Sequence, residues 1–289
     1  MPQHLRGIVA LLLVTMVWGT TFPAMKDLTA HHSPMWIIFI RFAVAGLLLT
    51  PFLWRARRDD LVSGALLGLL LFVCFVTQVE GLTLTSSNRN AFICGLNVLI
   101  VPLLGIFAGR WPERRIVLAL VLAVSGLALL CWDGGAWGRG DTLALVCAFC
   151  FAVYVRMMAE RTKRAYRLMT LTASQLGTVG VCAGIWLAAS GEGFAIPALG
   201  RDFYNVGYLA VVCTAAIISL QSWGQSRASA NEAAVIYAFE PAAAAFFAFF
   251  WLGETMTARG WLGGVLLISG MIVSQWNSES RPVAVLAPE

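Results

Sequence analysis

The chain has 289 residues, of which 59% are hydrophobic and 12% are charged, and its formal net charge is +5. Apolar stretches of about 20 residues recur along it, which excludes a soluble globular protein and indicates a polytopic protein surrounded by the lipid bilayer. The basic residues lie in short connectors between the apolar stretches. That distribution is a topology signal and not a binding patch, so a nucleic-acid partner is not expected.

Apolar stretches alternating with turn-forming and charged residues predict an all-α fold of ten transmembrane helices. The first stretch, which begins MPQHLRGIVALLL, has the composition of a signal peptide. It continues into an amphipathic end at Lys26, and another span follows about ten residues later, so we expect it to be retained. The spans are predicted at residues 6–25, 34–54, 61–83, 88–109, 115–132, 140–160, 168–189, 204–225, 231–252 and 259–276.

Lysine and arginine are distributed unequally between the alternating connectors. With a cytoplasmic N-terminus, fourteen of them fall in inner segments and five in outer segments, while Arg41 lies within a span. Because inner segments carry the excess of positive charge, both termini are predicted to be cytoplasmic. The connectors leave no room for a soluble catalytic domain, so any chemistry would take place among the helices.

Two segments of the chain resemble each other. TSSNRNAFICGLNVLIVP, at residues 85–102, opens the fourth span, and RASANEAAVIYAFEP, at 227–241, opens the ninth. They lie five spans apart, and because five is odd the corresponding helices cross the membrane in opposite directions. This predicts two inverted five-helix repeats, residues 1–137 and 138–278, followed by a disordered cytoplasmic tail at 279–289.

Glu240, followed at once by Pro241, is the deepest acidic residue in the predicted spans. A carboxyl group at this depth costs at least ~2.5 kcal/mol on insertion scales, so it is expected to face a cavity or the interior of the bundle. Pro241 removes a backbone donor and is predicted to kink the helix. In the alternative interpretation Glu240 is a neutral, hydrogen-bonded packing residue.

Further polar or amphipathic side chains lie within the spans, and each has a packing alternative. Asn97 is at a depth similar to that of Glu240, five residues before Pro102, the second predicted helix kink. Tyr237 is one turn before Glu240 on the same helical face. Together with aromatic rings for flat or apolar groups, these residues are predicted to line a substrate pocket. The set is completed by Trp18, Gln78, Tyr154 and Gln221.

Arg41 lies about seven residues past Pro34 in the second predicted span. Three roles are open to it, in this order of expectation. It can extend to the membrane surface, pair with Glu80, or meet a carboxylate of the substrate.

All seven cysteines fall inside the apolar stretches, where a thiol behaves as a small hydrophobic group and meets no oxidant. Cys147 and Cys150 form a CxxC pair without a second Cys or His pair within reach along the sequence, and all three histidines lie outside the spans. No metal, cofactor or disulfide is therefore expected.

Other polar and small residues have structural explanations. Ser229 and Glu232 have the spacing of a capping box, which predicts the start of the ninth helix. Gly64 and Gly68 form a small-xxx-small pair, which allows a neighbouring helix to approach closely.

Four segments carry a family resemblance: VWGTTFPAMK, WIIFIRFAVAGLLL, SSNRNAFICGLNVLIVP and SANEAAVIYAFEPAAAAFFAFFWLGE. With them the chain resembles EamA-type members of the drug/metabolite transporter superfamily, most of all the YddG-type amino acid exporters of bacterial inner membranes. The resemblance implies two inverted five-helix repeats around a central cavity lined by spans 1, 3, 4, 6, 8 and 9. It supports the seven candidates above as cavity residues. The proline of the first repeat falls three positions later than that of the second, so the resemblance does not establish a strict pairing of Asn97 with Glu240.

The predicted function is export of amino acids, aromatic and other neutral ones, or of related metabolites by alternating access. The alternative is a proton-coupled drug/metabolite antiporter that uses Glu240. A membrane-embedded enzyme would need clustered acids or a histidine motif at a membrane face, and the sequence has neither, so enzymatic activity is not expected. The expected partners are a small-molecule substrate and the bilayer. A monomer is compatible with two repeats in one chain.

Overall fold

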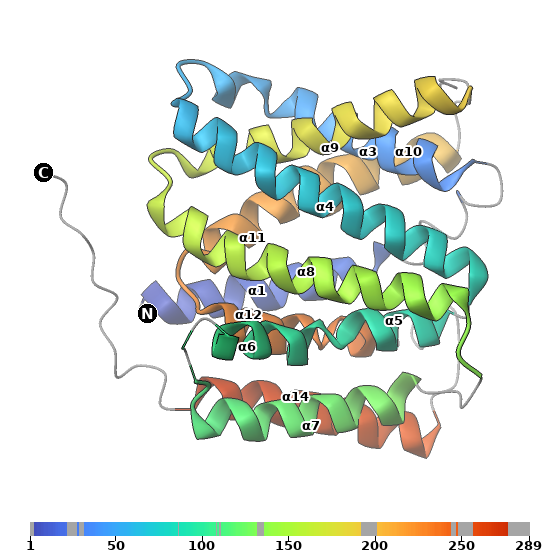
Figure 1. The fold of residues 1–289 in the computed structure, drawn as a ribbon, viewed down its shortest axis with the longest axis vertical. Coiled ribbons are helices and arrows are strands. Elements are labelled where there is room, and N and C mark those ends of the chain that lie inside the picture. The colour runs from blue at the N-terminus through green and yellow to red at the C-terminus, as the bar shows by residue number, and fades with distance from the viewer. Residues whose placement is uncertain are drawn as a thin grey trace, which may run out of the picture.

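A computed structural model describes residues 3–21, 28, 32–85, 87–107, 109, 111–131, 136–191, 201–243, 247 and 257–276. Within these residues all regular structure is helical (Figure 1). In the first half of the chain the elements are α1 (Gln3–Gly19), α3 (Pro34–Leu48), η1 (Thr50–Leu53), α4 (Arg58–Leu84), α5 (Ser87–Gly95), α6 (Asn97–Phe107) and α7 (Arg114–Cys131). In the second half they are α8 (Arg139–Arg164), α9 (Leu168–Ser190), α10 (Arg201–Gly207), η2 (Tyr208–Ala216), α11 (Ile217–Gln225), α12 (Ala230–Tyr237) and α14 (Ala258–Gln275).

Every predicted span overlaps a described helix or a run of consecutive helices. The span predicted at 61–83 is α4, and the one predicted at 204–225 is the continuous run of α10, η2 and α11. The latter includes nine residues of π-helix at Tyr208–Ala216, which sequence reasoning did not foresee. Part of the ninth span, and the predicted tail at 279–289, lie outside the described residues.

In the part of the chain that the structure describes, four helices are long and apolar enough to cross a membrane by length and composition: 58–84, 139–164, 168–190 and 202–225. Shorter apolar helices occur at 3–19, 34–48, 92–107 and 258–274. Large apolar side chains also cover the outside of the bundle. Leu47, Val121, Val181 and Ile272 are all more than half exposed. Such a surface is unusual for a soluble monomer and is typical of helices that face lipid.

The helix packing repeats itself between the two halves of the chain. The two halves can be matched by pairing α1 with α8, α3 with α9, α4 with the α10–α11 run, α5 and α6 with α12, and α7 with α14. Most helix pairs that pack together then correspond to another pair that packs together, or to themselves. Thus α4 packs on α8 and α9, while the α10–α11 run packs on α1 and α3. The pairs α3 with α9, α6 with α12 and α7 with α14 map onto themselves (Figure 1). The predicted boundary at residue 137 falls in the connector between α7 and α8.

Glycines let α4 and α9 pack closely, as their spacing predicted. A Cβ atom on Gly64 would lie 2.3 Å from the carbonyl oxygen of Leu171, and one on Gly68 would lie 2.6 Å from that of Gln175. Only glycine fits at these two positions, because a larger residue would collide with the α9 backbone.

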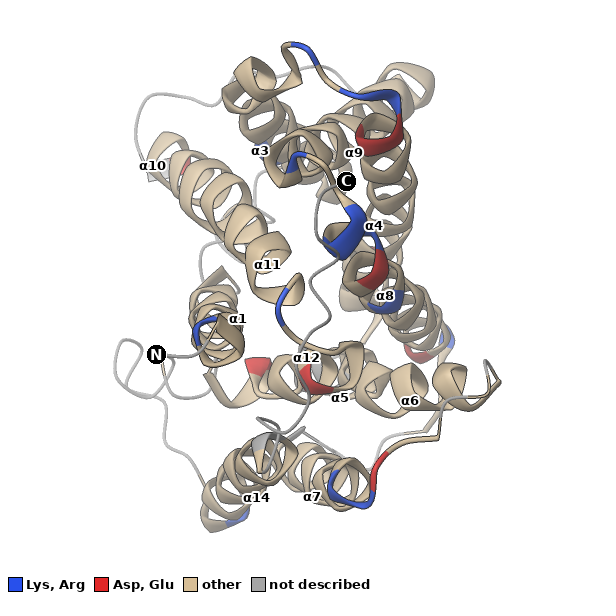
Figure 2. Ribbon diagram, turned by 90° about the vertical axis from the view of Figure 1, so that its left-hand side faces the viewer, with Lys and Arg blue, Asp and Glu red and all other residues tan. Residues whose placement is uncertain are grey.

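The predicted capping box at the start of α12 is confirmed, and its acid also links other helices. The Ser229 hydroxyl accepts from the backbone N–H of Glu232 at 3.2 Å, and the Ser229 backbone N–H donates to Glu232 Oε2 at 3.0 Å. Glu232 is also 3.3 Å from His4 Nε2 in α1 and 3.7 Å from Arg115 Nη2 in α7. Arg115 donates in turn to the carbonyl oxygen of Ser274 in α14 at 2.7 Å. These contacts join four helices at one end of the bundle, which Figure 2 shows from outside.

Candidate functional site

The fourth and ninth predicted spans are both interrupted in the middle of the bundle. Between α5 and α6 the chain makes one tight turn, in which the Leu96 N–H donates to the Ile93 carbonyl at 3.1 Å. After α12 the Phe239 N–H donates to the Ile236 carbonyl at 3.0 Å, and helical backbone resumes at residue 240. Both turns have the i to i−3 bonds of a 3₁₀ turn. The two interruptions are therefore alike, and they belong to the helices that correspond in the internal repeat.

Asn97 and Glu240 occupy equivalent places at these interruptions, because each is the first residue where the helix resumes. Asn97 and Glu240 therefore correspond to each other in the internal repeat, a pairing that the positions of the prolines had left open. Pro102 lies inside α6, five residues past its start, whereas Pro241 lies directly after Glu240. The prolines are thus offset from each other although the interruptions match.

A cavity with a volume of about 90 Å³ lies where the two interruptions meet. One water molecule needs roughly 10–15 Å³ on this measure, so the cavity has room for several waters or for a small organic molecule. Its wall is formed by Trp18, Thr21, Arg41, Leu71, Cys74, Phe75, Gln78, Cys94, Gly95, Asn97, Cys147, Phe151, Ile218, Tyr237, Glu240 and Pro241. The wall thus draws on α1, α3, α4, α5, α6, α8, α11 and α12.

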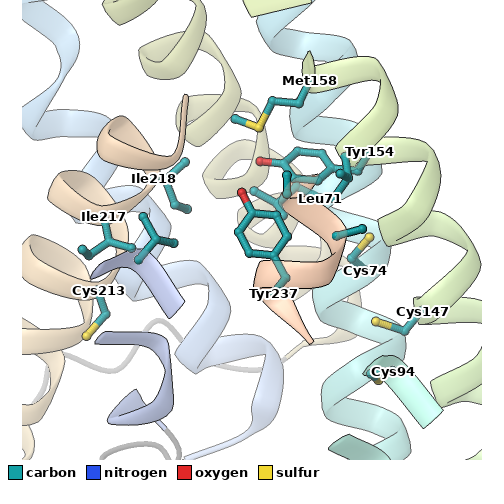
Figure 3. Packing of buried hydrophobic residues seen from close by; sticks show 14 of the residues in the cluster. Leu71, Cys74, Cys94, Cys147, Tyr154, Met158, Cys213, Ile217, Ile218 and Tyr237 are labelled. Carbon is teal, nitrogen blue, oxygen red and sulfur yellow. The ribbon is translucent and has the colours of Figure 1, made fainter. Parts of the chain in front are cut away.

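Aromatic rings form one side of the cavity. The centroids of Trp18 and Tyr237 are 5.7 Å apart, and Phe151 lies 6.5 Å from Trp18 and 6.1 Å from Tyr237. These separations are those of favourable aromatic pairs. Figure 3 shows Tyr237 between Ile218 of α11 and Cys74 of α4. The three rings provide an apolar surface against which a flat or aliphatic group can pack.

Polar groups lie on the wall beside these rings. The Asn97 side chain donates to the Cys94 carbonyl at 2.8 Å, and so satisfies a backbone group at the interruption. Its buried Oδ1 atom has no hydrogen-bond partner among the described residues. Glu240 and Gln78 also line the cavity. An amide acceptor and a carboxyl group are therefore available to donors of a bound molecule.

Five of the seven predicted substrate-binding residues come together on this wall, namely Trp18, Gln78, Asn97, Tyr237 and Glu240. The structure places the other two, Tyr154 and Gln221, behind it. Both are almost fully buried, and the Tyr154 hydroxyl accepts from Gln175 Nε2 at 2.7 Å and lies 3.4 Å from Gln221 Oε1. The Tyr237 hydroxyl and the Gln221 Nε2 atom are buried and have no hydrogen-bond partner among the described residues. Tyr154 and Gln221 thus back the aromatic wall.

The position of Arg41 contradicts the first two roles that the sequence led us to expect for it. It is 3% exposed and lines the cavity, so it does not extend to the membrane surface. Glu80 is exposed and is absent from the cavity wall, and the ion pairs recorded among the described residues include none between it and Arg41. Arg41 Nε instead donates to Thr214 Oγ1 at 2.8 Å.

Sequence reasoning missed several residues of the wall, although helical spacing could have found one of them. Phe75 precedes Gln78 by three positions, which places both on one helical face. Cys94 and Phe151 line the cavity as well. Cys74 and Cys147 also face the cavity. Among the residues that the structure describes, no group of three His, Cys, Asp or Glu side chains is arranged to hold a metal ion.

An internally repeated helical bundle with interrupted helices around a polar cavity is the architecture of a secondary transporter. A model of the EamA-like transporter family matches residues 5–132 and again residues 138–275. The two matches cover most of the sequence, so the chain belongs to the EamA-like transporter family and is a membrane protein.

Named relatives agree with this family. The chain is 26% identical to an uncharacterized transporter of Archaeoglobus fulgidus, covering 94% of this chain and 86% of the relative. It is 25% identical to the uncharacterized inner membrane transporter YedA of Escherichia coli, covering 96% and 94%. A probable terminal-alkyne amino-acid exporter of Streptantibioticus cattleyicolor is also 25% identical, covering 93% of each chain. A crystal structure with 17% identity superposes with a TM-score of 0.76 over 94% of this chain and 96% of the other, which shows that the fold is shared.

Proposed function

We propose that the chain exports amino acids, or related metabolites, across a bacterial inner membrane by alternating access. The observation that carries this proposal is the cavity between two interrupted helices, one from each EamA-like half. In transporters built from internal repeats, sites of this kind hold the substrate while the halves rock around it.

The proposal includes ten membrane crossings in two inverted five-helix halves, with both termini in the cytoplasm. The chain segments that begin α1, α4, α7, α9 and α12 all lie at the end of the bundle that faces the viewer in Figure 2. These segments carry most of the arginines. By the positive-inside rule this end is the cytoplasmic one. One chain supplies both halves of the cavity, so a monomer suffices.

The substrate class follows from the chemistry of the wall and from one relative. The rings of Trp18, Phe151 and Tyr237 suit an aromatic or other apolar side chain, while Asn97 and Glu240 suit its polar end. The Streptantibioticus relative is named as an amino-acid exporter, which favours aromatic and other neutral amino acids. In this proposal Gln78 also contacts substrate, and Tyr154 and Gln221 hold the aromatic wall in place.

A second candidate function is a proton-coupled drug/metabolite antiporter. The observation that favours it is the carboxyl group of Glu240 on the cavity wall, since a proton-driven cycle needs a group that binds and releases a proton. A facilitator needs no such group. The two candidates share the cavity and differ in their coupling.

The test is uptake of labelled amino acids into proteoliposomes that contain the full chain, with aromatic ones first, with and without an imposed pH gradient. For a facilitated exporter we expect saturable uptake whose rate is the same with and without the pH gradient. Acceleration by the gradient, abolished in Glu240→Gln, would instead establish the proton-coupled antiporter. If no amino acid is taken up while other metabolites are, the amino-acid proposal is wrong.

A further inference from the structure

Close contacts between helix backbones show which residues of the two halves correspond. Gly7 of α1 meets Gly224 of α11, where a Cβ atom on either residue would lie 3.0 or 3.1 Å from the carbonyl oxygen of the other. Gly81 of α4 and Gly140 of α8 meet in the same way and at the same distances. The second contact is the first one transferred to the other half, so Gly7 corresponds to Gly140 and Gly81 to Gly224. Residues of α1 therefore correspond to residues 133 positions later in α8, and residues of α4 to residues 143 positions later in the α10–α11 run.

The packing of α3 on α9 fixes the register of these two helices. A Cβ atom on Gly46 of α3 would lie 3.2 Å from the Cα atom of Gly177 in α9. One on Gly180 of α9 would lie 3.2 Å from the Cα atom of Ala43 in α3. The two contacts map onto each other when residues of α3 correspond to residues 134 positions later in α9. The two matches of the family model begin at residues 5 and 138, which is the same shift as between α1 and α8.

Three polar side chains of the cavity wall have polar counterparts that lie outside it. In this register Thr21, Arg41 and Gln78 of the first half correspond to Tyr154, Gln175 and Gln221 of the second. The aromatic position is different, because Trp18 corresponds to Phe151 and both residues line the cavity. The two halves thus share an apolar surface, but only the first one presents its polar positions to the cavity.

The three counterparts form one buried cluster. Gln175 Nε2 donates to the Tyr154 hydroxyl at 2.7 Å, and that hydroxyl donates to Gln221 Oε1 at 3.4 Å. Each side chain is at most 1% exposed, yet Gln175 Oε1 and Gln221 Nε2 have no hydrogen-bond partner among the described residues. An unpaired buried amide atom destabilises the fold, and an apolar side chain of similar length would avoid that cost. A second arrangement, in which the two amides find partners, explains why these residues are polar.

The cluster lies between the cavity and the end of the bundle that is proposed to be cytoplasmic. Tyr154 is one turn past Phe151 toward the C-terminal end of α8, and Gln221 is one turn past Ile218 toward the C-terminal end of α11. Those two ends lead into the starts of α9 and α12, which lie at the same end of the bundle (Figure 2). A molecule that enters the cavity from the cytoplasm therefore has to pass the cluster.

We propose that Tyr154, Gln175 and Gln221 contact the substrate when the cavity opens to the cytoplasm. They then take the places that their counterparts hold in this structure, because rocking of two inverted halves exchanges the positions of the halves around the site. This rests on the proposed function and names the residues at which an exported amino acid is first bound. The hydroxyl and the two amides offer uncharged hydrogen bonds to its polar end.

The first experiment compares the two faces of the membrane. Uptake of labelled phenylalanine is measured in right-side-out and inside-out vesicles, which present the outer and the cytoplasmic face of the full chain. Gln221→Met keeps the length of the side chain and removes the amide. It should raise KM at the cytoplasmic face about fivefold or more and change KM at the outer face less than about twofold. Gln78→Met, the matched counterpart, should show the reverse pattern, and equal changes at both faces for Gln221→Met would contradict the proposal.

The second experiment measures access to the cluster from the cytoplasmic face. Gln221→Cys and the control Leu176→Cys are treated in inside-out vesicles with a maleimide that does not cross membranes. Peptide mass spectrometry reads the labelling at each position, so the native cysteines stay in place. Leu176 is fully buried and corresponds to Phe42, which is also fully buried and absent from the cavity wall. Gln221→Cys should be labelled about fivefold faster or more than Leu176→Cys, and saturating phenylalanine should slow its labelling about threefold or more.

The outcomes distinguish this inference from the function on which it rests. Gln175→Cys, on another helix, replaces Gln221→Cys if that variant does not fold. If the protein transports phenylalanine but the cluster is labelled no faster than Leu176→Cys, the inference is wrong and the exporter proposal stands. If the cluster is labelled from the cytoplasmic face and is protected by another metabolite but by no amino acid, the three residues keep their role. The amino-acid proposal is then wrong.

Discussion

Replacing Asn97 by leucine tests whether this residue serves transport or the stability of the fold. The substitution removes the hydrogen bond to the Cys94 carbonyl, and leaving that buried acceptor without its partner costs about 1–3 kcal/mol. It also removes the buried Oδ1 atom, which has no partner among the described residues, and this relieves a penalty of about the same size. The two terms oppose each other. We therefore expect the free energy of unfolding to change by no more than about 1–2 kcal/mol.

Transport should respond differently from stability. If the Asn97 amide bonds the substrate, its loss removes one interaction worth about 1 kcal/mol, so kcat/KM for phenylalanine should fall about five- to tenfold. The assays are thermal unfolding in detergent and initial uptake rates in proteoliposomes. A drop of more than about 3 kcal/mol in the free energy of unfolding, or unchanged uptake, would refute the reasoning.

Asn90 provides a matched control in the same span. It is buried and does not line the cavity, its Nδ2 donates to the Gln78 carbonyl at 3.2 Å, and its Oδ1 accepts from Cys94 Sγ at 3.4 Å. Asn90→Leu breaks two bonds and relieves no unpaired atom. It should lower the free energy of unfolding by about 1–3 kcal/mol, while the folded fraction keeps the transport affinity of the wild type.

Two further substitutions test the packing of the bundle. Gly64→Ala places a Cβ atom 2.3 Å from the Leu171 carbonyl oxygen, so it should lower the melting temperature in detergent by the equivalent of about 1–3 kcal/mol. In the control variant Gly264→Ala the new Cβ meets nothing within 4 Å, so the melting temperature should stay unchanged or rise. Equal effects of the two substitutions would show that helix proximity is not the cause. Glu232→Ala removes the capping box and the contacts to α1 and α7, so it should lower the free energy of unfolding by about 1–2 kcal/mol, which is more than the loss expected for Ser229→Ala. A smaller loss for Glu232→Ala than for Ser229→Ala would contradict the role of Glu232 in linking the helices.

The sequence was informative wherever a feature depends on neighbouring residues. Apolar length placed the start of each predicted span within three residues of the start of a described helix, because a membrane-spanning segment is long and predominantly apolar and must satisfy its backbone internally. The S-x-x-E spacing predicted the cap at Ser229 and Glu232, and the Gly64 and Gly68 spacing predicted a close helix contact. All of these follow from geometry within one helix.

Interruption of a helix was less visible in the sequence. The prolines at 102 and 241 drew attention to the correct spans, but the interruptions fall at Leu96 and at Ala238 and Phe239, residues that do not by themselves end a helix. One contribution to the first interruption is the Asn97 side chain, which satisfies the Cys94 carbonyl. That contact exists only in the folded turn.

The sequence by itself determined a helical membrane protein of two related halves, and through its motifs the transporter family, because hydropathy and local spacing are properties of the chain. Only the tertiary structure decided which polar residues share one cavity. Arg41 and Glu240, about 200 residues apart, line the same wall, whereas Tyr154 and Gln221 lie behind it. A side chain's depth along a helix can be read from the sequence. The direction in which it points depends on how that helix rotates to pack against its neighbours, and no local pattern encodes that rotation.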